Sequence, residues 1–347
     1  MSDRFSPENP DLQQAMCSKP ACTQIICIVG PTGTGKSGLA LALAQHLNGA
    51  VINIDSRQVY LGLPVITAQP DLTASSGAFA QIPHLLYGFL PCTRKITAGL
   101  YAKLATEAIG LCLHLGRQPI LVGGTGLYLD ALLNGIAPIP PVSREISRYW
   151  QMRLERAGSR ALHAELAAVD PAYAAKISHN DPQRITRALE VWQASGHSLS
   201  HWHSQPAPKL PWPALKIGLR LPLPALQTRL AVRIEQMLDA GALAEVERAR
   251  NWANENPDAP GFSSIGFPEL AAHINGECDL AESKRRWLAS TRAYAKRQLT
   301  WFNRDKQIHW LGEGLCEHEP AALLTEALAL VRPGFPIEAG SDSPQSC

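Results

Sequence analysis

The residues GPTGTGKS, at positions 30–37, carry the clearest chemical signal in this chain. They fit the pattern G-x-x-x-x-G-K-[ST] and stand between the apolar run IICIVG and the helical pattern GLALALAQHL. Gly33 and Gly35 allow backbone N–H groups to converge on an anion, and the start of the following helix adds a partial positive charge. Lys36 adds a mobile positive charge, and the Ser37 hydroxyl can hold Mg²⁺. The stretch therefore predicts a loop that binds a phosphate or diphosphate group.

A carboxylate that could act beside this loop stands in an unusual place. Loops that hydrolyse or transfer a γ-phosphate normally pair with a strand that ends in Asp. The strand predicted over 118–124 runs instead into Gly-Gly-Thr. The carboxylate follows a different strand, 50–55, as the first residue of the polar run DSRQ at 55–58. This arrangement argues against a phosphate-transferring enzyme.

Asp55 and Thr125 are expected in one crevice with the phosphate loop, because the carboxyl ends of neighbouring parallel strands open on the same side. Alone, Asp55 would more often cap a turn and Thr125 would more often be a turn residue. The polar run above a phosphate loop favours a functional role for Asp55. A diphosphate leaving group needs no second carboxylate, because Lys36, the loop amides and Mg²⁺ can stabilise the departing oxygens. Asp55 could then activate the attacking nucleophile.

The elements that must position these residues predict an α/β fold with a doubly wound parallel sheet. Short apolar runs predict strands at 23–30, 50–55, 118–124 and 215–221, and helical patterns lie at 36–47 and 101–116. A single long helix is expected over 224–250, and a basic one follows the loop GFSSIGFPEL.

An all-helical, Arg-rich segment interrupts the sheet pattern. In its clearest helix, Asp181 can act as N-cap, Pro182 occupies the first turn, and Gly196 ends the helix. The predicted organisation is a flexible leader (1–22), a P-loop core (23–136 and 211–315), a helical insertion (137–210), and a C-terminal helix with a frayed tail (316–347).

Composition excludes several classes of protein. The 347 residues have a net charge of +2, and 46% are hydrophobic, so the chain is neither disordered as a whole nor globally basic. No apolar run of about 18 residues suggests a membrane span, and no secretory signal is visible. The eight Cys lack metal-type spacing, which favours reduced thiols in a cytoplasmic protein.

Positive charge is concentrated near the C-terminal end of the core. Residues 284–306 hold eight Lys or Arg against a single Asp. Arg285, Arg292 and Lys296 share one helical stripe, and a second, apolar stripe is expected to face a core. A solvated helix face and a track for the phosphate backbone of a nucleic acid are both open readings.

Five motifs together resemble the tRNA dimethylallyltransferases, also called tRNA isopentenylpyrophosphate transferases. They are GPTGTGKS, IDSRQVY, LVGGTGLYL, DPQRITRALEV and AKRQLTWF, in the family's order across roughly residues 24–311. The resemblance implies a P-loop α/β core whose helical insertion grips the anticodon stem-loop of tRNA. It implies transfer of the dimethylallyl group from dimethylallyl diphosphate to N6 of adenosine 37, with Mg²⁺ bound and diphosphate released. A monomeric cytoplasmic enzyme of the bacterial form is expected, with no membrane association.

The resemblance also assigns roles to residues, each on the position that matches a family motif. Catalysis falls to Asp55, as the base that deprotonates N6, with Thr125 nearby. The diphosphate falls to Gly30, Thr32, Gly33, Thr34, Gly35, Lys36, Ser37 and Arg233, with Mg²⁺ on Ser37. Contact with tRNA falls to Asp55, Ser56, Arg57, Gln58, Gln183, Arg184, Ile185, Thr186, Arg187, Arg297 and Gln298.

The chain departs from the family pattern at two places. Tyr87 stands where an Asp usually follows the PHxL motif, and Phe267 replaces a common Tyr in the loop SSIGFPEL, although Gly266 and Glu269 are kept. These changes leave the RNA contacts of that loop open.

Three alternative functions use parts of the same signal. A small-molecule kinase would share the loop but needs the missing strand-end Asp. An adenylate isopentenyltransferase would share the loop and Asp55, but not need the Arg-rich insertion. A non-enzymatic RNA-binding P-loop protein would leave Asp55 unexplained.

Overall fold

The computed structural model describes residues 24–71, 81–206, 209–252, 256, 258–312 and 319–331. The predicted leader, the tail beyond 331, and Cys17 and Cys22 lie outside these residues. The chain divides into two compact units, one made of Met1–Leu133 and Leu210–Cys347 and the other of Asn134–Lys209. We refer to them as the catalytic unit and the helical unit.

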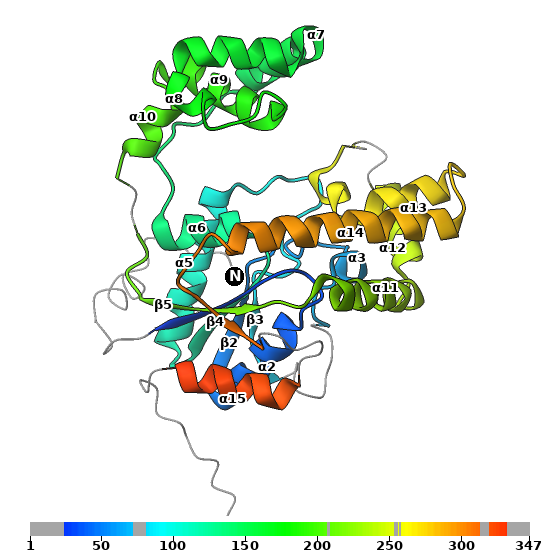
Figure 1. Ribbon diagram of the computed structural model, residues 1–347. Helices are drawn as coiled ribbons and strands as arrows, with labels where there is room; N and C mark the ends of the chain where they lie inside the picture. The colour runs from blue at the N-terminus through cyan, green and yellow to red at the C-terminus, as the bar shows by residue number, and fades with distance from the viewer. Residues whose placement is uncertain are drawn as a thin grey trace, which may run out of the picture. The chain divides into compact units, whose positions relative to one another are not determined.

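A six-stranded parallel sheet forms the centre of the catalytic unit, within the described residues (Figure 1). Its strands are β1 (Ile25–Val29), β2 (Gly49–Asn53), β3 (His84–Leu85), β4 (Gln118–Gly123), β5 (Ala214–Leu219) and β6 (Ile308–Leu311). Their order in space is β3-β2-β4-β1-β5-β6. The prediction of a parallel α/β sheet is confirmed. Strands β3 and β6 were not predicted, because they are short and lack a continuous buried run.

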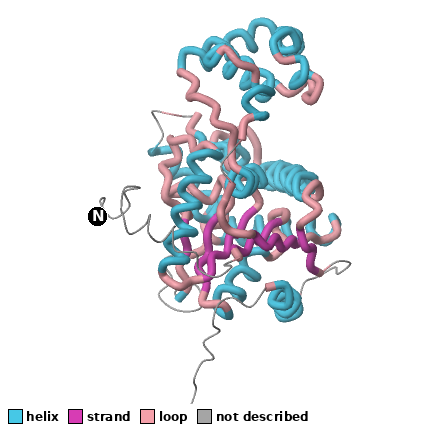
Figure 2. The backbone as a smooth tube through the Cα atoms, turned by 90° about the vertical axis from the view of Figure 1, so that its left-hand side faces the viewer, coloured by secondary structure: helices cyan, strands magenta, loops and turns pink. Residues whose placement is uncertain are grey.

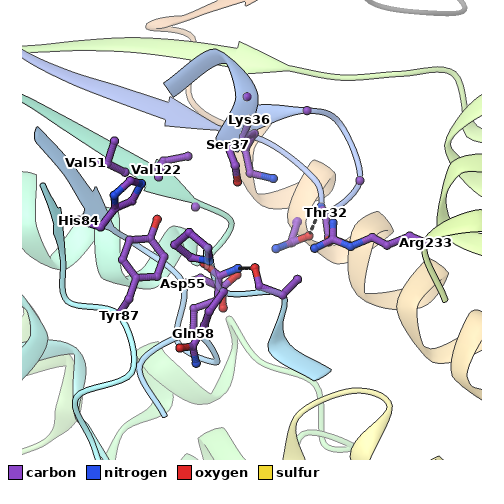
Figure 3. A pocket seen from close by; sticks show the side chains of 18 residues that line it. Thr32, Lys36, Ser37, Val51, Asp55, Gln58, His84, Tyr87, Val122 and Arg233 are labelled. Atoms are coloured by element: carbon purple, nitrogen blue, oxygen red, sulfur yellow. Dashed lines mark hydrogen bonds between the residues drawn. The ribbon is translucent and has the colours of Figure 1, made fainter. Parts of the chain in front are cut away.

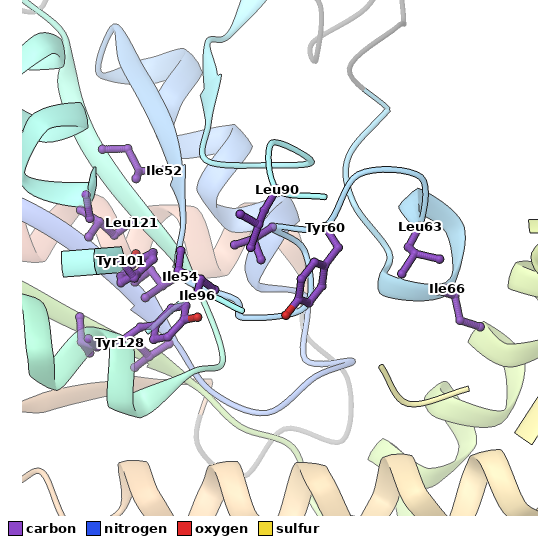
Figure 4. Close-up of a cluster of buried hydrophobic side chains, with 14 of the residues drawn as sticks. Ile52, Ile54, Tyr60, Leu63, Ile66, Leu90, Ile96, Tyr101, Leu121 and Tyr128 are labelled. Atoms are coloured by element: carbon purple, nitrogen blue, oxygen red, sulfur yellow. The ribbon is translucent and has the colours of Figure 1, made fainter. Parts of the chain in front are cut away.

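Alternate residues of β1 point to opposite faces of the sheet, and each face is covered by its own layer. Ile25, Cys27 and Val29 belong to a core that includes residues of α5 (Ala98–His114) and α6 (Gly126–Asn134). Figure 4 shows part of this core, where Tyr101 and Tyr128 lie beside strand residues. Ile26 and Ile28 pack instead with α2 (Lys36–His46) and α15 (Pro320–Leu330). The sheet is therefore wound on both faces, as predicted, and helices flank it in the rotated view of Figure 2.

The remaining helices of the catalytic unit lie beyond the carboxyl ends of the strands. They are α3 (Pro64–Thr67), α11 (Leu223–Asp239), α12 (Ala242–Trp252), α13 (Phe267–Ile274) and α14 (Leu280–Phe302), with a 3₁₀ turn at Pro260–Ser263. The prediction of one long helix over 224–250 is wrong. The chain breaks into α11 and α12 at Gly241, whose φ of 92° is incompatible with a continuing α-helix.

The helical unit contains α7 (Arg144–Val169), α8 (Pro171–Ala174), α9 (Pro182–Ser195) and α10 (Leu199–Ser204). Gly158, with φ 77°, kinks α7. The predicted ends of α9 are confirmed: Asp181 caps it by accepting a hydrogen bond from Arg184 N, and Gly196 ends it with φ 71°. On returning to the catalytic unit, the chain donates a hydrogen bond from Leu210 N to Leu133 O.

Candidate functional site

The phosphate loop joins β1 to α2 and wraps the start of that helix. Gly33 and Gly35 have φ values of 83° and 92°, which L-residues with a side chain rarely adopt. Thr34 is fully buried and donates a hydrogen bond to Pro31 O at 2.9 Å. The side chain of Thr34 thus braces the loop from inside, and Lys36 and Ser37 open the helix behind it.

Lys36 is folded back onto its own loop. Its Nζ donates to Pro31 O at 2.6 Å. Burial lowers the pKa of Lys36 to about 7, an effect that Asp55 opposes and Arg233 reinforces. An amine whose pKa lies near 7 is only partly protonated at neutral pH. It gains positive charge when an anion binds beside it, because an opposite charge favours the protonated form.

A cavity of about 320 Å³ lies in front of this loop (Figure 3). The loop side is formed by Thr32, Gly33, Gly35, Lys36 and Ser37. Asp55, Gln58, Tyr87 and Arg233 line it from other elements. The structure thus brings most of the residues assigned to diphosphate and catalysis into one cavity, although they are up to about 200 positions apart in sequence.

Asp55 both caps a turn and lines the cavity. Its Oδ1 accepts a hydrogen bond from Arg57 N at 2.8 Å, and its own N–H donates to Asn53 Oδ1 at 2.8 Å. Asn53 is fully buried and donates on to Asp55 O and Leu86 O. The turn-capping role expected of a lone Asp is therefore present, and it fixes the carboxylate at the cavity wall.

Thr125 lies against the polar run that starts at Asp55. Its Oγ1 accepts a hydrogen bond from Ser56 N at 3.0 Å, and the side chains of Thr125 and Ser56 are 3.3 Å apart at their oxygens. Tyr294 is the third member of this group: burial and Asp55 raise its pKa, and interactions with the side chains of Thr125 and Gln298 oppose that rise. Tyr294 was not found from the sequence, although it lies four residues before Gln298 on the same side of α14.

Arg233 extends from α11 toward the phosphate loop. Its guanidinium donates to Thr32 Oγ1 at 3.4 Å, and burial lowers the pKa of Arg233 against the effect of Asp55. A half-buried guanidinium next to a phosphate loop provides a positive charge for an anion. The N–H of Thr32 points elsewhere, to Gln298 Oε1 at 2.9 Å.

The two residues of α14 assigned to tRNA differ in their surroundings. Arg297 is exposed, and its guanidinium carbon lies 5.8 Å from the centre of the Tyr294 ring. Gln298 is only 5% exposed and is hydrogen-bonded to Thr32 and Gly124 within the catalytic unit. Since Gln298 shares a helix face with buried Ala295 and Phe302, its spacing was a signal for an inward position.

A second cavity, of about 290 Å³, adjoins the first. Both are lined by Thr32, Asp55, Gln58 and Arg233. The second is more apolar away from these shared residues, with Ile66, Leu230, Ile234, Met237, Ile265 and Trp287 among its lining. Asp55 therefore lies where a charged cavity meets one suited to a planar or apolar group.

Gln58 is held at this junction by α3. Its Nε2 donates to Thr67 O at 3.1 Å and to Ala68 O at 2.8 Å. Buried Glu245 holds the other end of α3 by accepting hydrogen bonds from Val65 N and Ile66 N, both at 2.8 Å. Burial raises the pKa of Glu245.

Arg57 is turned toward the loop before α13. Its guanidinium donates to Ser263 Oγ at 2.8 Å and to Pro260 O at 3.3 Å. In this loop Phe267 is buried and its ring stacks on Phe262, with centroids 4.3 Å apart. Glu269 accepts a hydrogen bond from Gly266 N at 2.8 Å, so the frame of the family motif is kept while its usual Tyr is replaced by a core side chain.

The tRNA residues assigned to the helical unit occupy the first turns of α9. Gln183, Arg184 and Arg187 are exposed. Arg184 lies 3.3 Å from Asp181 and Arg187 lies 3.4 Å from Glu190, as ion pairs that water weakens. Thr186 Oγ1 donates to Pro182 O at 2.9 Å. Ile185 is fully buried in the core of the unit, so its side chain is not on that surface.

No helix in the part of the chain that the structure describes is long and apolar enough to cross a membrane.

Comparison with known proteins identifies the family. The profile of the family described as IPP transferase matches residues 58–305. The tRNA dimethylallyltransferase of Oleidesulfovibrio alaskensis is 52% identical over 287 residues, covering 83% of this chain and 92% of its own length. That of Nitratidesulfovibrio vulgaris strain Miyazaki F is 50% identical over 303 residues, covering 83% of this chain and 88% of its own length.

Solved structures agree with this assignment. A tRNA delta(2)-isopentenylpyrophosphate transferase from Staphylococcus epidermidis has a TM-score of 0.62 at 29% identity, covering 88% of this chain and 98% of its own. A eukaryotic dimethylallyltransferase acting on tRNA has a TM-score of 0.71 at 30% identity, covering 83% of this chain and 73% of its own. The chain therefore belongs to the IPP transferase family of tRNA-modifying prenyltransferases.

Proposed function

We propose that this protein transfers the dimethylallyl group of dimethylallyl diphosphate to N6 of adenosine 37 in tRNA. The observation that carries the proposal is the position of Asp55, at the junction of the cavity in front of the phosphate loop and the more apolar second cavity. A proton acceptor at such a junction can serve a nucleophile that approaches from one cavity and a leaving group held in the other.

The diphosphate is assigned to the cavity in front of the phosphate loop. Lys36 and Arg233 supply positive charge, and the amides of the loop supply donors at the start of α2. As the bond between the allylic carbon and the diphosphate oxygen breaks, these groups stabilise the negative charge that develops on the leaving oxygens. N6 of adenine forms the new carbon–nitrogen bond and gives its proton to Asp55, which balances the reaction.

Magnesium fits the donor set of this cavity. Ser37 offers a hydroxyl at the start of α2, and diphosphate oxygens would supply further hard oxygen ligands. The described residues include no group of three or more His, Cys, Asp or Glu that could hold a metal by themselves. Ser37 would hold Mg²⁺, which would neutralise part of the leaving group's charge.

The acceptor is proposed to be an adenine flipped out of a tRNA loop. A base must leave its stack before its amino group can reach an allylic carbon. Gln58 lines both cavities, and its Nε2 is used by two backbone carbonyls, so its Oε1 is the amide atom proposed to accept from an exocyclic amine. Arg184 and Arg187 of the helical unit are proposed to bind the RNA backbone. Such an enzyme would work in the cytoplasm, where tRNA is modified.

A direct test incubates the protein with labelled dimethylallyl diphosphate, Mg²⁺ and either tRNA or AMP. Label on adenosine 37 of tRNA, with release of diphosphate, is the expected result. Label on AMP alone would indicate an adenylate isopentenyltransferase, and transfer of the γ-phosphate of ATP would indicate a kinase.

A further inference from the structure

The side-chain amide of Gln298 connects two segments that are distant in the sequence. Its Oε1 accepts from Thr32 N at 2.9 Å, and its Nε2 donates to Gly124 O at 3.0 Å. Thr32 belongs to the phosphate loop, and Gly124 directly precedes Thr125. Because Gln298 is 5% exposed, loss of the amide would leave buried polar groups without partners.

The backbone of the turn is shaped to admit this amide. A Cβ on Gly124 would overlap Gln298 Nε2, whereas its contact with Gly30 O would be an ordinary 3.4 Å. Gly124 does not have a positive φ, so its backbone conformation is open to any residue. The requirement for glycine at 124 therefore comes from the approach of Gln298.

A second side chain of α14 supports the same connection. Tyr294 lies one turn before Gln298 on α14, and its side chain interacts with the side chains of both Gln298 and Thr125. Tyr294 also lines the second cavity, and Gln298 lines the first. One face of α14 thus contacts the phosphate loop, the 124–125 turn and both cavities.

We propose that Gln298 is a positioning residue, whose amide fixes the separation between the leaving-group cradle at the phosphate loop and the nucleophile's side of the site at Thr125. This role rests on the proposed function. It replaces the direct contact with tRNA that the family resemblance assigned to Gln298. Its physical basis is that a displacement of about 1 Å between reacting groups can cost about 10²-fold in rate.

Loosening this connection has a chemical signature distinct from loss of folding. If the loop and the turn separate, water can reach the allylic carbon in place of N6. Water then forms the new carbon–oxygen bond, the bond to diphosphate breaks, and one proton is released, giving dimethylallyl alcohol and diphosphate. The ratio of hydrolysis to transfer therefore reports on positioning.

The experiment compares the full-length wild type with Gln298→Ala, Gly124→Ala and the double variant Gly124→Ala/Gln298→Ala. Products from labelled dimethylallyl diphosphate and tRNA are separated, and kcat, KM and the melting temperature are measured. Gln118→Ala is the matched control. Gln118 is also a buried Gln (4% exposed) with hydrogen bonds to backbone carbonyls, but it lies at the amino end of β4, away from the site.

In Gln298→Ala, kcat for transfer should fall by about 10²-fold, with KM for tRNA little changed and the hydrolysis-to-transfer ratio raised. Adding Gly124→Ala to Gln298→Ala should lower the melting temperature less than Gly124→Ala lowers that of the wild type, because removal of the amide makes room for the Cβ. The double variant should nevertheless keep the transfer defect. Gln118→Ala should lose stability without a change in the ratio.

An equal ratio in wild type, Gln298→Ala and Gln118→Ala would overturn the role of Gln298 and leave the proposed function standing. So would a large rise in KM for tRNA with kcat unchanged, which would restore the direct contact. Absence of transfer by the wild type would overturn the proposed function, and this role of Gln298 with it.

Discussion

Lys36 Nζ and Pro31 O are 2.6 Å apart, within a single phosphate loop. The ammonium group of Lys36 therefore already has an acceptor before any ligand binds, while burial keeps its pKa near 7. A diphosphate can bind the N–H donors of this ammonium group that Pro31 O does not use. In doing so it favours the protonated form of Lys36, so the pKa of Lys36 rises on binding.

The first prediction follows from that rise. Between pH 7 and the higher pKa of the complex, binding takes up a proton, so the affinity for inorganic diphosphate should fall as pH increases above about 7, by up to about tenfold per pH unit. Below pH 7 this contribution is constant. Titration calorimetry of Mg²⁺-free protein, in buffers of different ionisation enthalpy, measures both the affinity and the proton uptake.

Lys36→Arg is the control for this measurement. Arginine stays charged throughout, so the variant should lose the part of the pH slope that belongs to Lys36 and keep the part due to the ligand's own titration. Equal slopes in wild type and Lys36→Arg would show that Lys36 is charged in the free protein at all these pH values.

Asp55→Asn tests the proposed base without disturbing the turn. Asn keeps an oxygen that can accept from Arg57 N, as Asp55 does at 2.8 Å, but it cannot accept a proton. Turnover should fall by about 10²–10⁴-fold while tRNA affinity is retained. Single-turnover assays and a filter-binding titration measure the two quantities. Asp239→Asn, at the exposed end of α11, serves as control, and undiminished turnover in Asp55→Asn would refute the assignment.

Glu245→Ala should destabilise the catalytic unit. The carboxylate accepts from Val65 N and Ile66 N at 2.8 Å, and its removal leaves two backbone donors with no acceptor. We expect a loss of about 2–4 kcal/mol in the free energy of unfolding. Transfer should also weaken, because α3 holds Gln58.

Urea unfolding measures the loss, and Glu247→Ala on the exposed face of the same helix is its control. That substitution should change stability by no more than about 0.5 kcal/mol. If Glu245→Ala were as stable as Glu247→Ala, the two hydrogen bonds would have to be replaced by water.

Arg184→Ala tests the helical unit as an RNA-binding element. If Arg184 neutralises a phosphate, its loss should weaken tRNA binding whatever the nucleotide sequence of the tRNA. It should also reduce the slope of log affinity against log salt concentration by about 0.7–1. Binding measured at several salt concentrations gives this slope. Lys103→Ala, which removes an exposed cation on α5, should leave it unchanged. An unchanged slope in Arg184→Ala would mean that the residue is a solvated charge paired with Asp181.

The parts of the fold that the sequence predicted well are those fixed by local pattern. Buried β-branched runs gave β1, β2, β4 and β5, and cap residues gave both ends of α9. The two residues of β3 have no such pattern, because their pairing with Val51 and Ile52 depends on the sheet already being present. The break at Gly241 was missed because a glycine within an otherwise helical pattern is often tolerated.

In the candidate site, too, residues marked by a local motif could be predicted, whereas those whose position depends on packing could not. The phosphate loop and Asp55 could be placed on one crevice because both follow strands of a predicted parallel sheet, and they line one cavity. Tyr294 could not be found by motif, because its role depends on which face of α14 meets Thr125. For Gln298, the helical spacing from Ala295 and Phe302 is a signal for an inward side chain, but the resemblance to the family assigned it to tRNA.

The hydrogen bond between Leu210 N and Leu133 O, at 3.4 Å, closes the chain at the point where it leaves the catalytic unit. For a segment whose ends meet in this way, even a doubling of length costs its host only about 0.6 kcal/mol in closure entropy. The stability of the sheet therefore depends little on the length of the segment inserted there. Evolution can lengthen, shorten or resurface the helical unit, while the reaction centre stays as it is.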